Sequence, residues 1–192
     1  DIALITKEDV ELPFTKKEDL CIDLDGRIEA YDISNISGTS AVGVMTVFEN
    51  KKPAKSKYRK FKIKTVKGAN DTAMMEEVMR RRLLRAEKFP KAWELPVIMV
   101  IDGGKPQVNR VKEILNEFKL EIPIIGIAKG FDRKQDVLIF DRANIELSRD
   151  IVRGKEIFQK IRDEAHRFAV KYHRQLRSKN SGIKHLSAIT HE

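Results

Sequence analysis

Apolar and polar residues alternate with a period of two in three segments near the start of the chain, at residues 28–33, 39–49 and 58–64. This period is typical of β-strands, because successive side chains point to opposite faces of a sheet. Short links join the segments, and Gly38 marks the turn in the first link. The pattern therefore predicts three strands in an antiparallel meander.

From residue 70 onward, apolar residues at helical spacing alternate with short continuous apolar runs. Asn70 and Asp71 are residue types that cap helices, and Pro90 ends the first helical pattern. Continuous apolar runs are typical of strands buried on both faces of a parallel sheet. The predicted elements are a helix at 71–88, a strand at 97–101, a helix beginning at Pro106 and a strand at 123–128.

The last third of the chain predicts a further extended region and one long helix. Residues 136–141 and 144–149 are predicted to form a hairpin or an extended pair, and a helix is predicted at about 154–178. The fold class is therefore α/β, with a mixed sheet of three antiparallel strands followed by alternating helices and strands, flanked by helices. This order is also that of ribonuclease H-like folds. We expect a lead-in or linker at 1–27, one domain at 28–180 and a tail at 181–192.

The composition fits a folded domain that needs no disulfide. Cys21 is the single cysteine among 192 residues, which excludes an internal disulfide and fits a reducing cytosol. No apolar stretch approaches the roughly 20 residues that span a bilayer, which excludes a membrane protein. Asp1–Asp9 holds no basic segment followed by an apolar one, so we expect no signal peptide there.

Positive charge is concentrated after the first 29 residues. Residues 1–29 hold nine acidic and four basic residues, whereas the remainder holds 34 basic and 20 acidic residues. Such a basic body favours a polyanionic partner, because lysines and arginines that neutralise phosphates release counterions. Residues 51–67 contain nine lysines or arginines and no acid, interleaved with Tyr58 and Phe61, and are a candidate phosphate-binding surface. The alternative is a solvated edge strand that lysines protect from aggregation. The arginines at 80–82 either extend this surface or form an exposed helix face.

Asp32 falls on the same predicted strand face as Ile28 and Ala30. Burying an unpaired carboxylate costs several kcal/mol, so Asp32 requires a cation, a hydrogen-bond network or a metal ion. The alternative is an aspartate at a strand end that caps the turn at 34–35.

Asp102 ends the buried strand at 97–101, and two glycines follow it. Ligands in open α/β sheets bind outside the carboxyl ends of the strands, although Asp-Gly-Gly is also an ordinary connection between strand and helix. If the strands of Asp32 and Asp102 are neighbours, the two carboxylates need a divalent cation or a shared proton. Hard oxygen ligands favour Mg²⁺ or Mn²⁺ over zinc.

His166 lies on the flank of the last predicted helix, one turn after Arg162 and two turns before His173. A lone histidine on a helix is usually solvated or at the edge of the core. The spacing alone therefore leaves the role of His166 open. Asp163 and Glu164 can pair locally with Arg167 and need no other explanation.

Four ordered sequence blocks together resemble the C-terminal endonuclease domain of the UvrC family, the incision subunit of bacterial UvrABC nucleotide-excision repair. The resemblance runs from about residue 28 to residue 179. The blocks are Tyr31-Asp32-Ile33-Ser34-Asn35 with Gly38, Ile101-Asp102-Gly103-Gly104-Lys105 with Gln107, Gly126-Ile127-Ala128-Lys129-Gly130, and residues 162–169 through Tyr172-His173-Arg174.

The resemblance implies a ribonuclease H-like fold and metal-dependent cutting of the damaged strand on the 5′ side of the lesion. The family's catalytic residues map onto Asp32, Asp102, His166 and Asp71. Asp32 and Asp102 would bind Mg²⁺ or Mn²⁺, and His166 would be a further ligand or would position water or a leaving group. The implied partners are damaged double-stranded DNA and UvrB in the pre-incision complex, with UvrA acting upstream, in the bacterial cytoplasm. The domain itself is expected to be monomeric.

Two positions depart from the family pattern, since Asn35 stands where many relatives have histidine and Pro106 stands where glycine is common. The chain also shows neither the family's N-terminal GIY-YIG module nor its tandem helix-hairpin-helix module after Lys179, so we expect the complete protein to be larger. The expected DNA-binding residues contact backbone phosphates, which suits a nuclease that ignores base identity. They are Lys57, Arg59, Lys60, Lys62, Lys105, Arg162, Arg167 and Arg174.

Two alternatives remain at this point. An endonuclease V-like nuclease of the same fold would use acidic ligands throughout, which the histidine in the block at 163–166 disfavours. A basic nucleic-acid-binding or scaffold domain would have purely structural carboxylates, and would show no metal-dependent cleavage.

Overall fold

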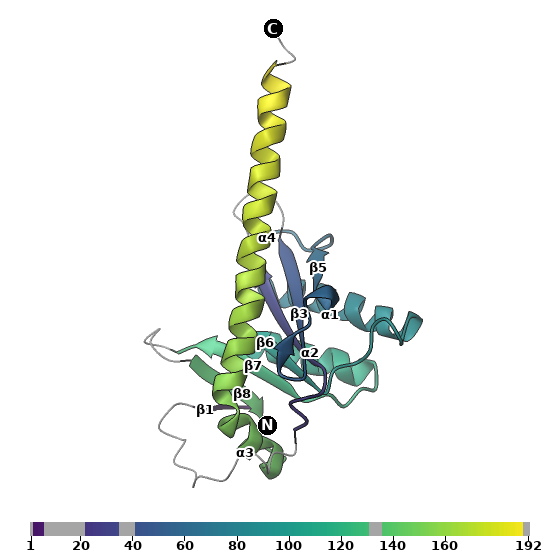
Figure 1. The fold of residues 1–192 in the computed structure, drawn as a ribbon. Helices are drawn as coiled ribbons and strands as arrows, with labels where there is room; N and C mark the ends of the chain where they lie inside the picture. Colours follow the sequence, from purple (N-terminus) through teal and green to yellow (C-terminus); the bar gives the residue numbers. More distant parts are fainter. Residues whose placement is uncertain (1, 6–21, 35–40, 131–135, 190–192) are drawn as a thin grey trace.

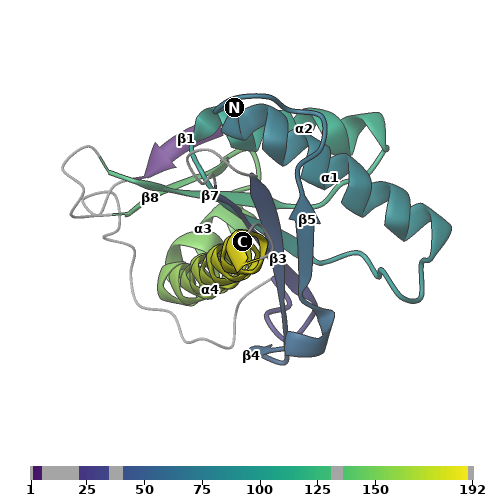
Figure 2. The same ribbon diagram turned by 90° about the horizontal axis from the view of Figure 1, so that it is seen from above.

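The computed structural model describes residues 2–5, 22–34, 41–130 and 136–189, with side chains described from residue 22 to residue 175 within these ranges. A mixed sheet lies between two pairs of helices (Figures 1 and 2). The strands are β1 (Ile2–Ile5), β2 (Ile28–Ser34), β3 (Val42–Glu49), β4 (Lys52–Pro53), β5 (Arg59–Lys62), β6 (Ile98–Asp102), β7 (Ile124–Lys129) and β8 (Asp136–Asp141). The helices are η3 (Lys55–Lys57, a 3₁₀ turn), α1 (Asp71–Lys88), α2 (Lys105–Glu117), α3 (Ile145–Arg153) and α4 (Lys155–Ile189).

The strands follow the order β1-β8-β7-β6-β2-β3-β4, and β5 also pairs with β3. Strands β2, β3 and β5 form the predicted antiparallel meander, and β6 and β7 add to β2 in parallel. The predicted mixed α/β sheet is therefore confirmed. Because β2 and β6 are parallel with Tyr31 opposite Ile101, their carboxyl ends lie side by side.

Each face of the sheet carries its own apolar core. Helices α3 and α4 cover one face, and α1 and α2 cover the other (Figure 2). Along β6, Ile98 and Val100 point to the α3–α4 face, and Met99 and Ile101 to the α1–α2 face. This two-sided burial explains why the run at 97–101 reads as continuously apolar.

The second half of the predicted hairpin at 136–149 is wrong, because residues 145–153 form helix α3. The Asn144 side chain caps this helix by accepting a hydrogen bond from the Leu147 amide at 3.0 Å. The buried residues Ile151 and Val152 lie beyond the window at 144–149. The helical spacing becomes visible only when the window extends past residue 149.

Two further segments differ from the predicted boundaries. Helix α4 continues to Ile189, past the expected end at about residue 178 and into the segment expected to be a tail. Within the expected lead-in at 1–27, β1 pairs with β8 and extends the sheet by one strand. Among the described residues, none of the helices combines the length and the apolar character needed to cross a bilayer.

The arginine run at 80–82 is only partly an exposed helix face, because Arg82 is completely buried. Its Nε and Nη2 atoms donate to the Glu29 carboxylate at 3.0 and 2.8 Å, and the Tyr31 hydroxyl donates to the same carboxylate. The Arg82 guanidinium also donates to the backbone oxygens of Trp93 and Glu94, at 3.1 and 2.6 Å. Arg82 therefore joins α1 to β2 and to the loop before β6.

Gly126 in β7 lies where helix α2 packs against the sheet. A Cβ atom at this position would lie 2.4 Å from Val108 Cγ2 and 3.2 Å from Ile139 Cβ. Both neighbours are buried β-branched residues, 1% exposed, which leaves little room to move. The absence of a side chain at residue 126 sets how closely α2 approaches β7.

We expect Gly126→Ala to lower the free energy of unfolding by about 1–3 kcal/mol, since overpacking forces helix α2 or the strand to shift. Urea denaturation monitored by circular dichroism measures the change. In a Val108→Ala background the same substitution should cost at least about 1 kcal/mol less, because the clashing methyl group is gone. Equal costs in both backgrounds would show that Val108 does not limit the approach.

Candidate metal centre

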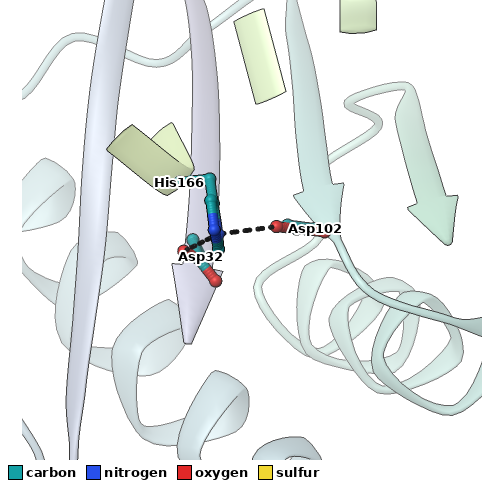
Figure 3. Close-up of side chains that lie close together, drawn as sticks. All are labelled: Asp32, Asp102 and His166. Carbon is teal, nitrogen blue, oxygen red and sulfur yellow. Dashed lines mark ion pairs between the residues drawn. The ribbon is translucent and has the colours of Figure 1, made fainter. Parts of the chain in front are cut away.

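Three predicted site residues meet at the carboxyl edge of β2 and β6 (Figure 3). Asp32 lies near the end of β2, Asp102 is the last residue of β6, and His166 comes from α4. His166 Nδ1 lies 3.3 Å from Asp32 Oδ2 and 3.8 Å from Asp102 Oδ2. Each residue offers one ligand atom, and these atoms all lie within 4.8 Å of one another.

Local structure explains how the chain brings these groups together. Parallel pairing of β2 with β6 places the two aspartates next to each other on the face covered by α4. Ala165 and Ala169 are buried against the sheet, so small side chains let the helix backbone approach closely beside His166. After Asp102 the chain turns directly into α2, where the Gln107 side chain accepts from the Gly104 amide at 3.0 Å.

The electrostatics of the site favour a bound cation. Asp32 is 5% exposed, and its Oδ2 atom accepts no hydrogen bond from the residues that the structure describes. Burial, and then the negative charge of Asp102, raise the pKa of Asp32 to about 6, although His166 opposes the shift. Burial also raises the pKa of Asp102, against the opposing charges of Arg162, His166 and Lys129. Two carboxylates that resist ionisation side by side form a fitting site for a divalent ion.

The residues present suit a hard metal ion with open coordination positions. Two carboxylates supply oxygen ligands, which Mg²⁺ and Mn²⁺ prefer. The His166 side chain is 59% exposed, so this side of the site is accessible to solvent and to a substrate. Asp32, Asp102 and His166 would hold the ion.

The fourth predicted catalytic residue, Asp71, lies outside this group of three. It is the exposed first residue of α1, directly after the cap Asn70, whose side chain accepts from the Ala73 amide. Burial and Asp102 are the larger causes of the raised pKa of Asp32, and the charge of Asp71 adds to them. Asp71 is therefore within electrostatic reach of the centre.

Three of the predicted DNA-binding residues in the basic segment already make side-chain contacts within the chain. Lys57 Nζ lies 2.6 Å from Glu49, the Arg59 guanidinium stacks 5.3 Å from the Trp93 ring centroid, and Lys60 Nζ lies 4.1 Å from that of Tyr172 on α4. Lys62 is exposed at the end of β5, and Lys105 is exposed at the start of α2.

The predicted DNA-binding arginines of α4 differ in their surroundings. The Arg162 side chain is 11% exposed, and its Nη atoms donate to Asp136 at 3.1 and 2.7 Å. Arg167 pairs with Glu164 at 2.6 Å. Arg167 and Arg174 also line a surface hollow of about 640 Å³, together with Asp163, His166, Val170 and Lys171. Arg162 thus forms an ion pair within the domain, whereas the hollow presents basic groups beside His166.

Sequence reasoning did not assign a role to Lys129 or Asp136, which lie opposite each other on β7 and β8. The signal that would have placed them is strand alternation. Lys129 continues the series of Ile125 and Ile127, whose side chains lie in the core under α4. Both charged residues therefore emerge from the face of the sheet that carries Asp102.

Comparison with known protein families identifies a match to the UvrC RNase H endonuclease domain over residues 18–170. UvrABC system protein C of Streptococcus pneumoniae is 48% identical over 168 residues, covering 85% of this chain and 26% of that protein. UvrABC system protein C of Finegoldia magna is 47% identical over 158 residues, covering 80% of this chain and 26% of that protein. The chain thus spans about a quarter of the length of these relatives.

Solved structures with a similar arrangement are more distant. Endonuclease V of Ciona intestinalis in complex with a 23mer DNA containing an inosine aligns with a TM-score of 0.41 at 18% identity, over 55% of this chain and 46% of that chain. Human endonuclease V aligns with a TM-score of 0.38 at 12% identity, over 55% and 46% of the two chains. The family match and the two bacterial relatives, at nearly half identity over most of the chain, show that it belongs to the UvrC family and contains the family's RNase H endonuclease domain.

Proposed function

We propose that this domain cuts damaged DNA in a metal-dependent reaction, on the 5′ side of the lesion, as part of UvrABC nucleotide-excision repair. The observation that carries the proposal is the convergence of Asp32, Asp102 and His166 at one edge of the sheet, with ligand atoms within 4.8 Å of one another. Membership in a family of endonuclease domains supports the reaction class. Asp32 is buried beside a second carboxylate, and a purely structural role would leave the cost of ionising it there without compensation.

We propose the following roles for the three residues. Asp32 and Asp102 would hold the cation, which would polarise the phosphate and activate water. In the reaction a water oxygen bonds to phosphorus and gives up a proton to solvent, the bond from phosphorus to the 3′ oxygen breaks, and that oxygen takes up a proton, so that one water is consumed. His166 either completes the ligand set or positions the water or the leaving oxygen through its exposed imidazole, with Nδ1 facing the carboxylates.

Basic groups beside the centre support the DNA-binding part of the proposal. Arg167, Lys171 and Arg174 line the same hollow as His166 along α4, so they form a track that leads away from the metal site. Lys62 and Lys105 present further exposed cations. Contacts from such groups to phosphates position the duplex without reading its bases, as a repair nuclease requires.

The partners follow from the family. The names of the relatives place them in the UvrABC system, and we extend this to the present chain. We infer that the complete protein acts on a damaged duplex held by UvrB, after UvrA, in the bacterial cytoplasm. We expect the domain to act as a monomer with one metal centre.

The test is nicking of a duplex with a damage-like bubble by the 192-residue chain in Mg²⁺, in Mn²⁺ and in EDTA. We expect cuts with 5′-phosphate and 3′-hydroxyl ends in either metal and none in EDTA. Both ions should also raise the melting temperature of the protein, because they bind the folded state. Equal cleavage in EDTA would contradict a metal-dependent reaction.

The isolated chain can lack affinity that the rest of the protein supplies. The same comparison is therefore repeated with the complete protein, UvrA and UvrB, after inactivation of the N-terminal GIY-YIG nuclease module that we expect in the complete protein. A complete complex that makes no 5′ cut in either metal would rule out the proposed function.

A further inference from the structure

Four charged residues form a row across the sheet, at the edge that carries the candidate metal centre. They are Asp32 on β2, Asp102 on β6, Lys129 on β7 and Asp136 on β8. Each continues a series of residues whose side chains lie in the core beneath α3 and α4, namely Ile28 and Ala30, Ile98 and Val100, Ile125 and Ile127, and Leu138 and Phe140. Since alternate residues of a strand share a face, all four side chains emerge toward α4.

The register places Lys129 beside the metal centre. Ile127 is the residue directly opposite Asp102, and Lys129 is the next residue of β7 on that face, about 7 Å further along the strand. This separation is within reach of the long lysine side chain. Electrostatics agree with this placement. Burial raises the pKa of Asp102, and the positive charge of Lys129 is one of those that oppose this rise.

Arg162, another cation close to this row, is already paired. It binds Asp136 through two nitrogens and Asp163 through Nε at 2.8 Å. Asp136 lies opposite Lys129 on the neighbouring strand, but its carboxylate is already paired with Arg162. Lys129 is exposed and makes no hydrogen bond or ion pair with any residue in the described ranges. Its charge is available to a ligand.

We propose that the Lys129 ammonium binds a non-bridging oxygen of the phosphate that is cut, opposite the side held by the metal centre. This inference rests on the proposed function. Two carboxylates and one divalent ion sum to zero charge, so the phosphodiester anion and the charge that develops on it during attack need a further cation. A cation beside the phosphate, where negative charge develops, lowers the barrier. Lys129 keeps its proton throughout, while water adds to phosphorus and the 3′ oxygen leaves.

A simpler role for Lys129 is that of a counter-ion to Asp102 in the absence of metal. The two roles make opposite predictions. A counter-ion competes with the metal, so removing it strengthens metal binding and leaves the rate at saturating metal unchanged. A phosphate contact affects the rate at saturating metal and leaves metal binding intact.

The experiment compares wild type with Lys129→Met, Lys129→Arg and Lys91→Met, in the complete protein with UvrA and UvrB. Lys91→Met is the matched control, because Lys91 is an exposed lysine in the connection between α1 and β6, before the amino end of β6. Single-turnover incision is measured at saturating Mg²⁺, together with DNA affinity and the rise in melting temperature on adding the metal.

We expect Lys129→Met to slow incision by about 10²-fold or more, as for removal of other groups that stabilise transition-state charge. Lys129→Arg should retain a rate within about tenfold of wild type, because it keeps a cation at the same place. Lys91→Met should stay within about threefold of wild type, since exposed charges far from a site are screened. The metal-induced rise in melting temperature should persist in all variants.

An incision rate of Lys129→Met within threefold of wild type would overturn the inference and leave the proposed function standing. Loss of the metal-induced rise in melting temperature in this variant would also overturn it, because the effect would then lie in metal binding. If Lys91→Met slowed incision as much as Lys129→Met, the effect would reflect net charge only. A wild-type complex that does not cut would remove the proposed function, and this inference with it.

Discussion

Asp32→Asn and Asp102→Asn are each expected to reduce metal-dependent incision by at least about 10³-fold. An amide carries no negative charge, so it cannot hold a divalent ion against water as a carboxylate does. The contribution of a metal to such a reaction is several kcal/mol, and each 1.36 kcal/mol corresponds to a factor of ten in rate. Single-turnover nicking in Mg²⁺ and in Mn²⁺ measures the loss.

The same Asp32→Asn substitution is expected to stabilise the domain when metal is absent. Burial and the neighbouring Asp102 raise the folded-state pKa of Asp32 to about 6, above its unfolded value, so ionisation disfavours the fold. This cost appears as pH rises from about 4 to about 6, and above that range it amounts to about 3 kcal/mol. We expect Asp32→Asn to raise the free energy of unfolding by about 1–3 kcal/mol at pH 8 in EDTA, and by less near pH 4.

The control for both measurements is Asp25→Asn. Asp25 is exposed just before β2 and its carboxylate pairs with exposed Lys51 at 3.4 Å, so its removal should change neither rate nor stability appreciably. Incision by Asp32→Asn or Asp102→Asn at the wild-type rate would remove the substituted residue from the metal centre. A loss of stability in Asp32→Asn at pH 8 in EDTA would show that its carboxylate is well compensated without metal.

Arg82→Met is expected to lower the free energy of unfolding by about 3–5 kcal/mol. The guanidinium is fully buried, and removing it leaves the buried Glu29 carboxylate with a weaker set of partners. Arg27 Nε, at 2.8 Å, and the Tyr31 hydroxyl remain bonded to Glu29. The backbone oxygens of Trp93 and Glu94 lose their donor as well, which adds to the cost.

Urea denaturation at fixed pH provides the measurement, with Arg85→Met as the matched control. Arg85 lies one turn further along α1, is exposed, and stacks 5.8 Å from the Trp93 ring centroid, so its replacement should cost less than about 1 kcal/mol. Adding Glu29→Gln to Arg82→Met should recover part of the loss, because the uncompensated charge is removed. Similar costs for both arginines would contradict a special role for the buried one.

The aspartates of the site could be predicted from the sequence because each is tied to a strong local pattern. Asp102 closes an unbroken apolar run, and Asp32 falls on the apolar face of an alternating strand. That the two aspartates meet depended on β2 and β6 being neighbouring strands, which the sequence does not show. The structure shows that these strands pair in parallel. His166 was identified by resemblance, since helical spacing alone does not tell an active-site flank from a solvated one.

Features that depend on distant partners could not be predicted in this way. Arg82 looked like one of three exposed arginines, because its partner Glu29 lies 53 residues earlier and on another element. Helix α3 was missed because its buried residues lie beyond the six-residue window at 144–149. The intramolecular contacts of Lys57 and Arg59 likewise appear only once Glu49 and Trp93 are in place.

Because His166 lies on α4, late in the sequence, an incomplete chain can end before it. A ribosome adds residue 166 some 64 positions after residue 102, which at about 5–20 residues per second means several seconds of synthesis. A nascent or prematurely terminated chain can carry both aspartates and still lack the imidazole and the basic track beside it. Under the proposed function, a chain that ends before residue 166 would therefore lack a complete metal centre in this domain.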